Sequence, residues 1–197
     1  MIRLKEGVYT WSSFDWDRGF NLNGFLFGSE DRCVVVDPPP LSDDDRSYLE
    51  SVALWPDTIV ITNRDHVRDR DWWLKRRMMP TAMHEEEAGQ VDFKIDQPLR
   101  DGDLVGPGLR AVHLPGKSSG EIALYWRERK LLLLGDALIG PQGRLRLATE
   151  TKRGDIALLS RSLQKLSGLD FEMLLLTDGD PLLHGAKAAV ESFVQAL

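Results

Sequence analysis

Four short polar clusters, each directly after an apolar segment of strand length, constrain the fold of this chain more than any other feature. The clusters are Asn63-Arg64-Asp65-His66, Lys117-Ser118-Ser119, Gly135-Asp136 and Asp178-Gly179-Asp180. One such cluster says little, because polar turn residues end most strands. When a sheet brings strand ends together, however, these clusters commonly build a site. Their order and spacing therefore bear on both fold and function.

The apolar segments alternate between strand-like and helix-like periods, which predicts a mixed α/β fold. We expect strands at 8–14, 24–27, 32–36, 58–62, 93–95, 104–105, 109–114, 122–126, 131–134 and 171–176. Helices are expected after Ser42, over 67–78, over 158–166 and from Pro181. Since no repeat, low-complexity run or linker divides the chain, we expect a single domain over residues 1–197.

Composition excludes several classes of protein. Twenty-five Lys and Arg residues stand against 31 Asp and Glu, and the net charge of −6 repels the phosphates of nucleic acids. The only cysteine, Cys33, lies in an apolar run, which excludes a disulfide framework and a four-cysteine zinc module. The start of the chain lacks the apolar stretch of a secretory signal, and no segment is apolar enough to span a bilayer. We therefore expect a cytoplasmic protein without nucleic-acid or membrane partners.

The order of the clusters resembles the metallo-β-lactamase superfamily across nearly the whole chain. In that family a strand ending in Thr precedes an HxHxDH motif, and PGHTxG, a GD after a hairpin strand and a GHG follow. The matching stretches here are 60–68, 114–120, 134–136 and 176–179, and Val35-Val36-Asp37 resembles an early strand that ends in aspartate. The resemblance implies a four-layer αββα sandwich with its site at one edge of the two sheets. It also implies a metal-dependent hydrolase.

At the metal positions the chain departs from the family. Aligned without a gap from Thr62, it has other residues at most ligand positions: Asn63, Asp65, Val67 and Arg68 in the first motif, Lys117 in the second and Asp178 in the last. Only Asp136, the family's metal-bridging aspartate, is kept. Protonated lysine and arginine offer no lone pair to zinc. We therefore expect no dinuclear zinc centre.

The replacements suggest what fills the space of the metals. Arg68 and Lys117 could approach Asp65, Asp136 and Asp178 and offset their charge, because buried carboxylates need compensation. We expect an ion-pair network of Asn63, Asp65, Arg68, Lys117, Asp136 and Asp178 in place of a cofactor. In particular, Lys117 is expected to contact Asp136 or Asp178.

A gap in the first motif gives a second alignment, in which Asp65-His66 matches the Asp-His that ends HxHxDH. Asp65, His66, Asp136 and Asp178 could then surround at most one divalent metal ion. One imidazole with several carboxylates suits Mn²⁺, Fe²⁺ or Mg²⁺ at least as well as zinc. Alternatively, His66 lies at the start of a helix and faces solvent or a carboxylate.

Two functions of different classes remain. One is a diverged hydrolase that uses at most one metal to activate water. The other is a non-catalytic descendant that binds a small anionic metabolite or a protein partner through Arg68 and Lys117. Fold alone does not choose between them.

Overall fold

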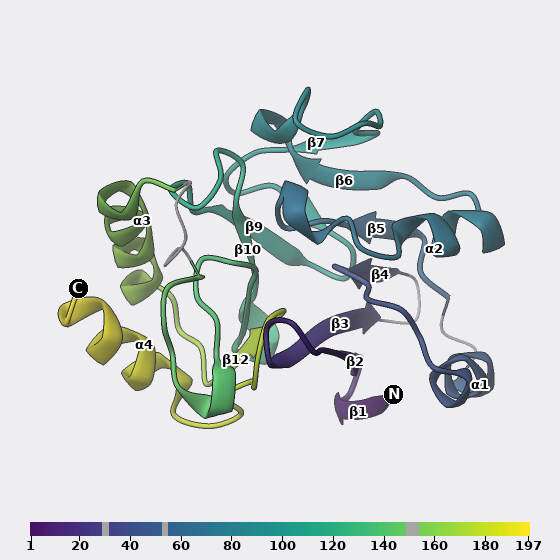
Figure 1. Cartoon of the computed structure of the whole chain (residues 1–197), viewed down its shortest axis with the longest axis horizontal. Coiled ribbons are helices and arrows are strands. Elements are labelled where there is room, and N and C mark those ends of the chain that lie inside the picture. The colour runs from purple at the N-terminus through teal and green to yellow at the C-terminus, as the bar shows by residue number, and fades with distance from the viewer. Residues whose placement is uncertain (29–31, 53–54, 149–153) are drawn as a thin grey trace.

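The structure is a computed structural model of the whole chain, and it describes residues 1–28, 32–52, 55–148 and 154–197 (Figure 1). The larger sheet has seven strands in the spatial order β1 (Ile2–Lys5), β2 (Val8–Asp15), β3 (Phe20–Gly28), β4 (Cys33–Val36), β5 (Thr58–Val60), β6 (Thr81–His84) and β7 (Gln97–Leu99). Neighbours from β1 to β4 pair antiparallel, and those from β4 to β7 pair parallel.

The smaller sheet has five strands in the order β12 (Met173–Leu176), β11 (Leu131–Leu134), β10 (Ile122–Trp126), β9 (Leu109–His113) and β8 (Leu104–Val105). Only the pair β11–β12 is parallel. Four α-helices complete the described chain: α1 (Asp43–Val52), α2 (Arg70–Arg76), α3 (Ile156–Leu163) and α4 (Ala186–Gln195). None of the described helices has the length and apolar character needed to cross a bilayer.

The apolar residues form three buried clusters that separate four layers. In β11, Leu131 and Leu133 face the larger sheet, while Leu132 and Leu134 face α3 and α4. In β4, Val34 and Val36 join the cluster between the sheets, and Cys33 and Val35 join the cluster on the outer face of the larger sheet. Because successive side chains of a strand point to opposite faces, continuous apolar runs suit strands that are covered on both sides. The observed architecture is the expected αββα sandwich.

Several expected elements differ from the structure. Residues 93–95 form no strand, because Phe93 and Ile95 pack against the outer cluster of the larger sheet without pairing. The expected helix over 67–78 is interrupted at Arg68, whose φ of 45° is left-handed, and α2 begins only at Arg70. The last helix begins at Ala186, since Leu182 first pairs with Leu174 as a β-bridge. Strands β1, β6 and β7 were not expected.

Candidate functional site

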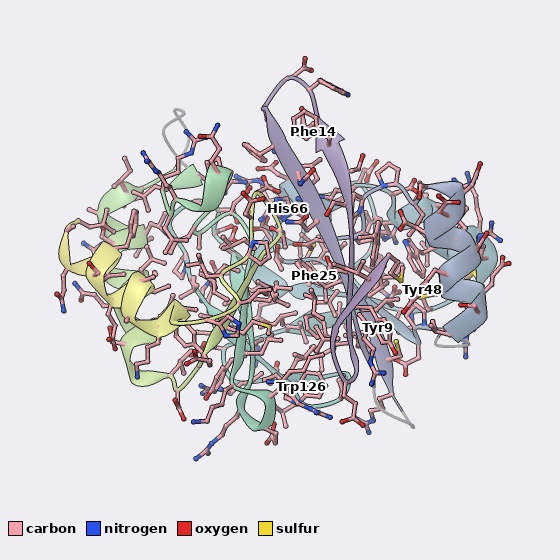
Figure 2. The ribbon with its side chains drawn as sticks, turned by 90° about the horizontal axis from the view of Figure 1, so that it is seen from below. Tyr9, Phe14, Phe25, Tyr48, His66 and Trp126 are labelled. Carbon is pink, nitrogen blue, oxygen red and sulfur yellow. The ribbon has the colours of Figure 1, made fainter. Side chains whose placement is uncertain are left out.

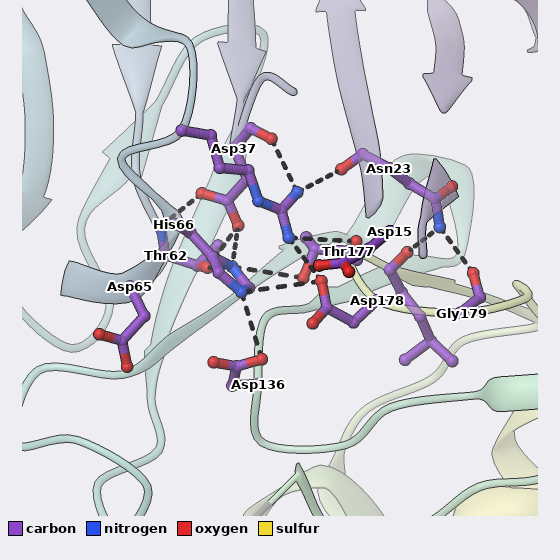
Figure 3. A network of polar contacts seen from close by, with 12 residues as sticks. Asp15, Asn23, Asp37, Thr62, Asp65, His66, Asp136, Thr177, Asp178 and Gly179 are labelled. Carbon is purple, nitrogen blue, oxygen red and sulfur yellow. Dashed lines mark hydrogen bonds and ion pairs between the residues drawn. The ribbon is translucent and has the colours of Figure 1, made fainter. Parts of the chain in front are cut away.

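The candidate site lies where the carboxyl ends of β4, β5, β11 and β12 meet. Backbone hydrogen bonds join the two sheets here: Ile122 N donates to Thr62 O at 3.0 Å, and Asn23 N donates to Thr177 O at 2.7 Å. Gly135 allows a close approach, since a Cβ at this position would overlap Thr62 Oγ1 and Glu121 Oε1. The polar residues that follow these strands therefore face one another across the sandwich edge (Figure 3).

Asp37, at the end of β4, fixes the position of the His66 ring. Its carboxylate accepts hydrogen bonds from Thr62 N at 2.8 Å, from Thr62 Oγ1 at 2.5 Å and from His66 Nδ1 at 2.9 Å. Asp37 itself has a φ of 45°, which is uncommon for a residue other than glycine. A carboxylate bound to Nδ1 orients the imidazole, so that Nε2 points to the other side of the ring.

His66 Nε2 points at two more carboxylates. It lies 3.2 Å from Asp136 Oδ1 and 3.8 Å from Asp178 Oδ1, and the side chain is 1% exposed. Burial alone would lower the pKa of His66, but the Asp136 and Asp37 carboxylates outweigh burial and raise the pKa to about 10. The ring is therefore an imidazolium at neutral pH and acts as a buried cation among three aspartates.

Arg68 is the second buried cation. Its guanidinium donates to the carbonyl oxygens of Asn23 at 2.9 Å, Asp37 at 3.0 Å and Thr177 at 3.3 Å, and to Asp178 Oδ1 at 2.5 Å (Figure 3). These acceptors come from β3 and from the ends of β4 and β12. Arg68 therefore holds both sheets together at this edge, and both of its terminal nitrogens are committed to the protein.

Lys117 is the third cation and lies nearer the surface. Its Nζ contacts Asp65 Oδ2 and lies 2.5 Å from Asp136 Oδ2. Burial would lower the pKa of Lys117, but Asp136 and Glu121 raise it above the ordinary lysine value. The Lys117 side chain is 14% exposed, whereas that of Asp65 is 57% exposed. Lys117 thus bridges an outer and an inner carboxylate and stays protonated.

The loop that carries Lys117 is anchored on both sides. Ser118 Oγ donates to Glu87 Oε1 at 2.5 Å, and Gly120 N donates to the same oxygen at 3.0 Å. On the other side, Ser162 Oγ of α3 donates to Pro115 O at 2.7 Å. The ammonium group is therefore placed by a fixed backbone.

Two further buried groups adjoin this network. Glu121 is fully buried, and burial raises the pKa of its carboxyl well above the ordinary value, with a further contribution from Asp136. Neither Glu121 oxygen has a hydrogen-bond partner among the described residues. Asn63 Oδ1 accepts from Asp65 N at 2.9 Å, while its Nδ2 has no partner within the same described set. Burial accordingly favours the protonated form of Glu121, and Asn63 has a donor available.

A dinuclear metal centre does not fit this donor set. In the alignment without a gap, Lys117 and Arg68 fall at two histidine positions of the family motifs, and both cations are bound to the carboxylates that a metal would need. Val67, at a third ligand position, packs against the outer apolar cluster of the larger sheet. Among the described residues, positive side chains therefore lie against the carboxylates of this edge.

A single divalent ion meets a better set of ligands. His66, Asp136 and Asp178 offer one ligand atom each, all within 4.8 Å of one another. An imidazole and two carboxylates suit Fe²⁺ or Mn²⁺. Asp65, which the sequence also predicted as a ligand, lies outside this group because its exposed carboxylate pairs with Lys117. The candidate metal site thus has three residues instead of four.

Sequence reasoning missed three contributors to the site. Asp37 appeared only as a landmark at a strand end, although its position before three prolines already indicated a fixed carboxylate. Arg18, from the β2–β3 turn, lies 3.3 Å from Asp178 Oδ2 and is half-exposed. No local signal marks Arg18, because its contact spans 160 positions of sequence. Glu121 follows a glycine in a turn, and only the fold shows that it is buried.

Comparisons with known proteins agree with this fold. The metallo-beta-lactamase superfamily model matches residues 3–197, and the chain belongs to this superfamily. The chain is 25% identical to the probable metallo-hydrolase YqgX of Bacillus subtilis (strain 168), over 81% of this chain and 85% of that protein. It is 35% identical to a hydroxyacylglutathione hydrolase of Ectopseudomonas mendocina (strain ymp), over 58% of this chain and only 46% of that enzyme.

Among solved structures, TTHA1623 in a di-iron-bound form superposes with a TM-score of 0.72 at 22% identity, covering 88% of this chain and 96% of that one. At this identity the likeness concerns the fold. The chain is thus metallo-hydrolase-like in family and architecture, and its chemistry depends on its own residues.

Proposed function

We propose that this chain binds a small anionic ligand at the sandwich edge and does not hydrolyse it through a dinuclear metal centre. In this proposal, three side-chain cations neutralise the aspartates of the site, as metal ions do in the family. His66, Lys117 and Arg68 face the carboxylates of Asp37, Asp65, Asp136 and Asp178. Three cations thus stand against four carboxylates, and the half-exposed Arg18 beside Asp178 adds a fourth cation.

The observation that carries this proposal is the position of Lys117. Its Nζ lies between the carboxylates of Asp65 and Asp136, at ion-pair distance from both. An ammonium at this place competes directly with a divalent cation for the same oxygens. Because Arg68 donates all its contacts to the protein, a ligand would meet Lys117 and the half-exposed Arg18.

Metal analysis tests the proposal. Protein purified without chelator should contain well below one equivalent of Zn, Mn or Fe by elemental analysis, and calorimetric titration with Zn²⁺ or Mn²⁺ should show weak binding. Lys117→His removes the competing charge and restores an imidazole, so it should bind these ions more tightly than the parent does. Lys75→His, at an exposed position of α2 away from the edge, is the matched control. About two tightly held ions per chain would refute the proposal.

A second candidate function is a hydrolase with a single metal ion, and one observation favours it. Asp37 holds His66 Nδ1, so that Nε2 faces Asp136 and Asp178, an arrangement in which metal-binding histidines are commonly oriented. Here His66, Asp136 and Asp178 would hold the ion, which would supply an activated water when bound. The same analysis separates the candidates, because this one requires about one ion per chain that is lost in His66→Ala.

A further inference from the structure

A cavity of about 450 Å³ lies at the end of the smaller sheet that is distant from the candidate site. Strand β10 connects the two places, since it begins next to Glu121 at the site and reaches Tyr125 at the cavity. None of the residues that line this cavity takes part in the ion-pair network of the site. The cavity therefore needs an explanation of its own.

The register of the sheet shows how the cavity arises. Leu104 pairs with Arg110, and Arg110 pairs with Tyr125, so these three side chains form one row on the outer face of the smaller sheet. Tyr125 belongs to the apolar cluster beneath α3 and α4. The short 3₁₀ segment Gln164–Gly168 ends this helical cover. Beyond it, Leu104 is largely exposed, and the row continues without a covering layer.

The floor of the cavity is rigid and aromatic. The Tyr125 side chain is buried with 5% exposure, and its hydroxyl donates to Asp170 O at 2.9 Å. The guanidinium of Arg110 lies over this ring, with Cζ 5.5 Å from the ring centroid. Leu169 and Leu104 add apolar lining. Because 5.5 Å leaves no room for a further layer between the ring and the guanidinium, a flat apolar group could pack only beside them, along the apolar lining.

Two cations in the lining form no ion pair at contact distance, although Arg127 lies close enough to Asp170 to help lower the pKa of that carboxyl, after Lys130 as the main cause. Neither Arg110 nor Arg127 forms an ion pair within the described residues, although the chain has a net charge of −6. The rim also carries the exposed carboxylates of Glu128 and Asp170. The Asp170 carboxylate already pairs with Lys130 at 2.9 Å. The guanidinium groups of the lining are thus available to an anion that enters from solvent.

We propose that this cavity binds a small organic anion with a flat apolar body, such as an aromatic carboxylate. The volume lies within the range of small-molecule sites, whose lining is commonly apolar with a few placed polar groups. The carboxylate of the ligand would pair with Arg110 and Arg127, and its apolar body would pack beside Tyr125, along Leu169. Guanidinium groups suit this role because their fork matches a carboxylate.

The probe for the test is 2-naphthoate, and the uncharged 2-naphthamide is its ligand control. Calorimetric titration of the full chain should give saturable binding of 2-naphthoate, and the amide should bind at least about tenfold more weakly. Backbone amide NMR shifts should map to residues 104–110, 125–128 and 168–170. Failure of 2-naphthoate to saturate, or equal binding of the amide, would overturn the proposal.

Variants distinguish binding in this cavity from unspecific attraction to surface charge. Arg110→Gln and Arg127→Gln should each weaken 2-naphthoate binding by about tenfold. Because Arg127 is exposed, its replacement leaves the fold intact and keeps the test valid if Arg110→Gln unfolds. Arg77→Gln, an exposed arginine of the α2 end, should change nothing, and Glu128→Gln should tighten binding by removing a rim anion. Equal loss in Arg77→Gln would indicate unspecific attraction and contradict the proposal.

Discussion

In two buried histidines of this protein, the pKa is shifted in opposite directions. His66 is 1% exposed, and His84, at the end of β6, is 4% exposed. Carboxylates surround His66 and raise its pKa to about 10 in spite of burial. Burial lowers the pKa of His84, and so does His113, whose ring stacks on it with centroids 3.9 Å apart. Figure 2 shows His66 in the interior, below the projecting β2–β3 hairpin that carries Phe14.

The contrast shows that neighbours, more than burial, set the charge of a buried side chain here. The His84 ring can remain neutral because His84 Nδ1 only has to accept a hydrogen bond from Glu86 N at 3.3 Å. The His66 ring lies among Asp37, Asp136 and Asp178, which would be repelled from one another without a cation. His66 therefore compensates the buried carboxylates at the sandwich edge, whereas His84 contributes to packing at the end of β6.

The largest expected effect follows from removing the His66 cation. His66→Ala leaves Asp37 and part of Asp136 buried without compensation, which should lower the free energy of unfolding by about 3–5 kcal/mol. His84→Ala is the matched control at equal burial and should cost less, about 1–2 kcal/mol, because it removes only packing and a capping acceptor. Urea unfolding at pH 7 measures both values. Equal losses would mean that burial, and not charge, dominates at both positions.

A smaller effect is expected at the outer cation. Lys117→Ala leaves the buried carboxylate of Asp136 with His66 alone, and it should lower the free energy of unfolding by about 1–3 kcal/mol. Lys75→Ala, at an exposed position of α2 with no ion pair in the described chain, should be nearly neutral. Thermal melts of the parent and both variants measure the difference. A neutral Lys117→Ala would show that Lys117 is a surface turn residue.

Much of the fold could be predicted because its strands are apolar runs with clear turn signals. Residues 131–134 are four leucines that follow a charged turn, and they form β11 as expected. Strand β6 could not be predicted in this way, since Thr-Ala-Met-His has neither strict alternation nor strong β propensity. It becomes a strand because β5 and β7 pair with it on both sides.

The candidate site was predictable only in part, for a geometric reason. That Lys117 would approach Asp136 follows from the order of the strand ends. The central position of His66 could not be predicted from that order. A left-handed conformation at Arg68 and a short 3₁₀ turn over Arg64–His66 redirect the side chains of the first motif. The partner of the His66 ring, Asp37, is 29 residues away, and its role depends on the parallel pairing of β4 with β5.

The smallest expected effect concerns stability at acidic pH, and it tests the lowered pKa of His84. The pKa of His84 is lowered in the folded chain, so below the ordinary histidine value of 6.5 the unfolded chain binds the additional proton first. The contribution of His84 to stability is therefore present above pH 6.5 and is lost as the pH falls from there towards the folded pKa. Glu85, Glu86 and Glu87 act in the opposite direction and limit the shift.

His84→Asn keeps a capping acceptor for Glu86 N and removes the titration, so it isolates this contribution. Urea midpoints between pH 7.5 and 5.5 should fall less steeply for His84→Asn than for the parent. His184→Asn, at an exposed position, should follow the parent curve. If His84→Asn and the parent lose stability in parallel, the pKa of His84 is the same in the folded and unfolded chain, and burial and His113 do not lower it.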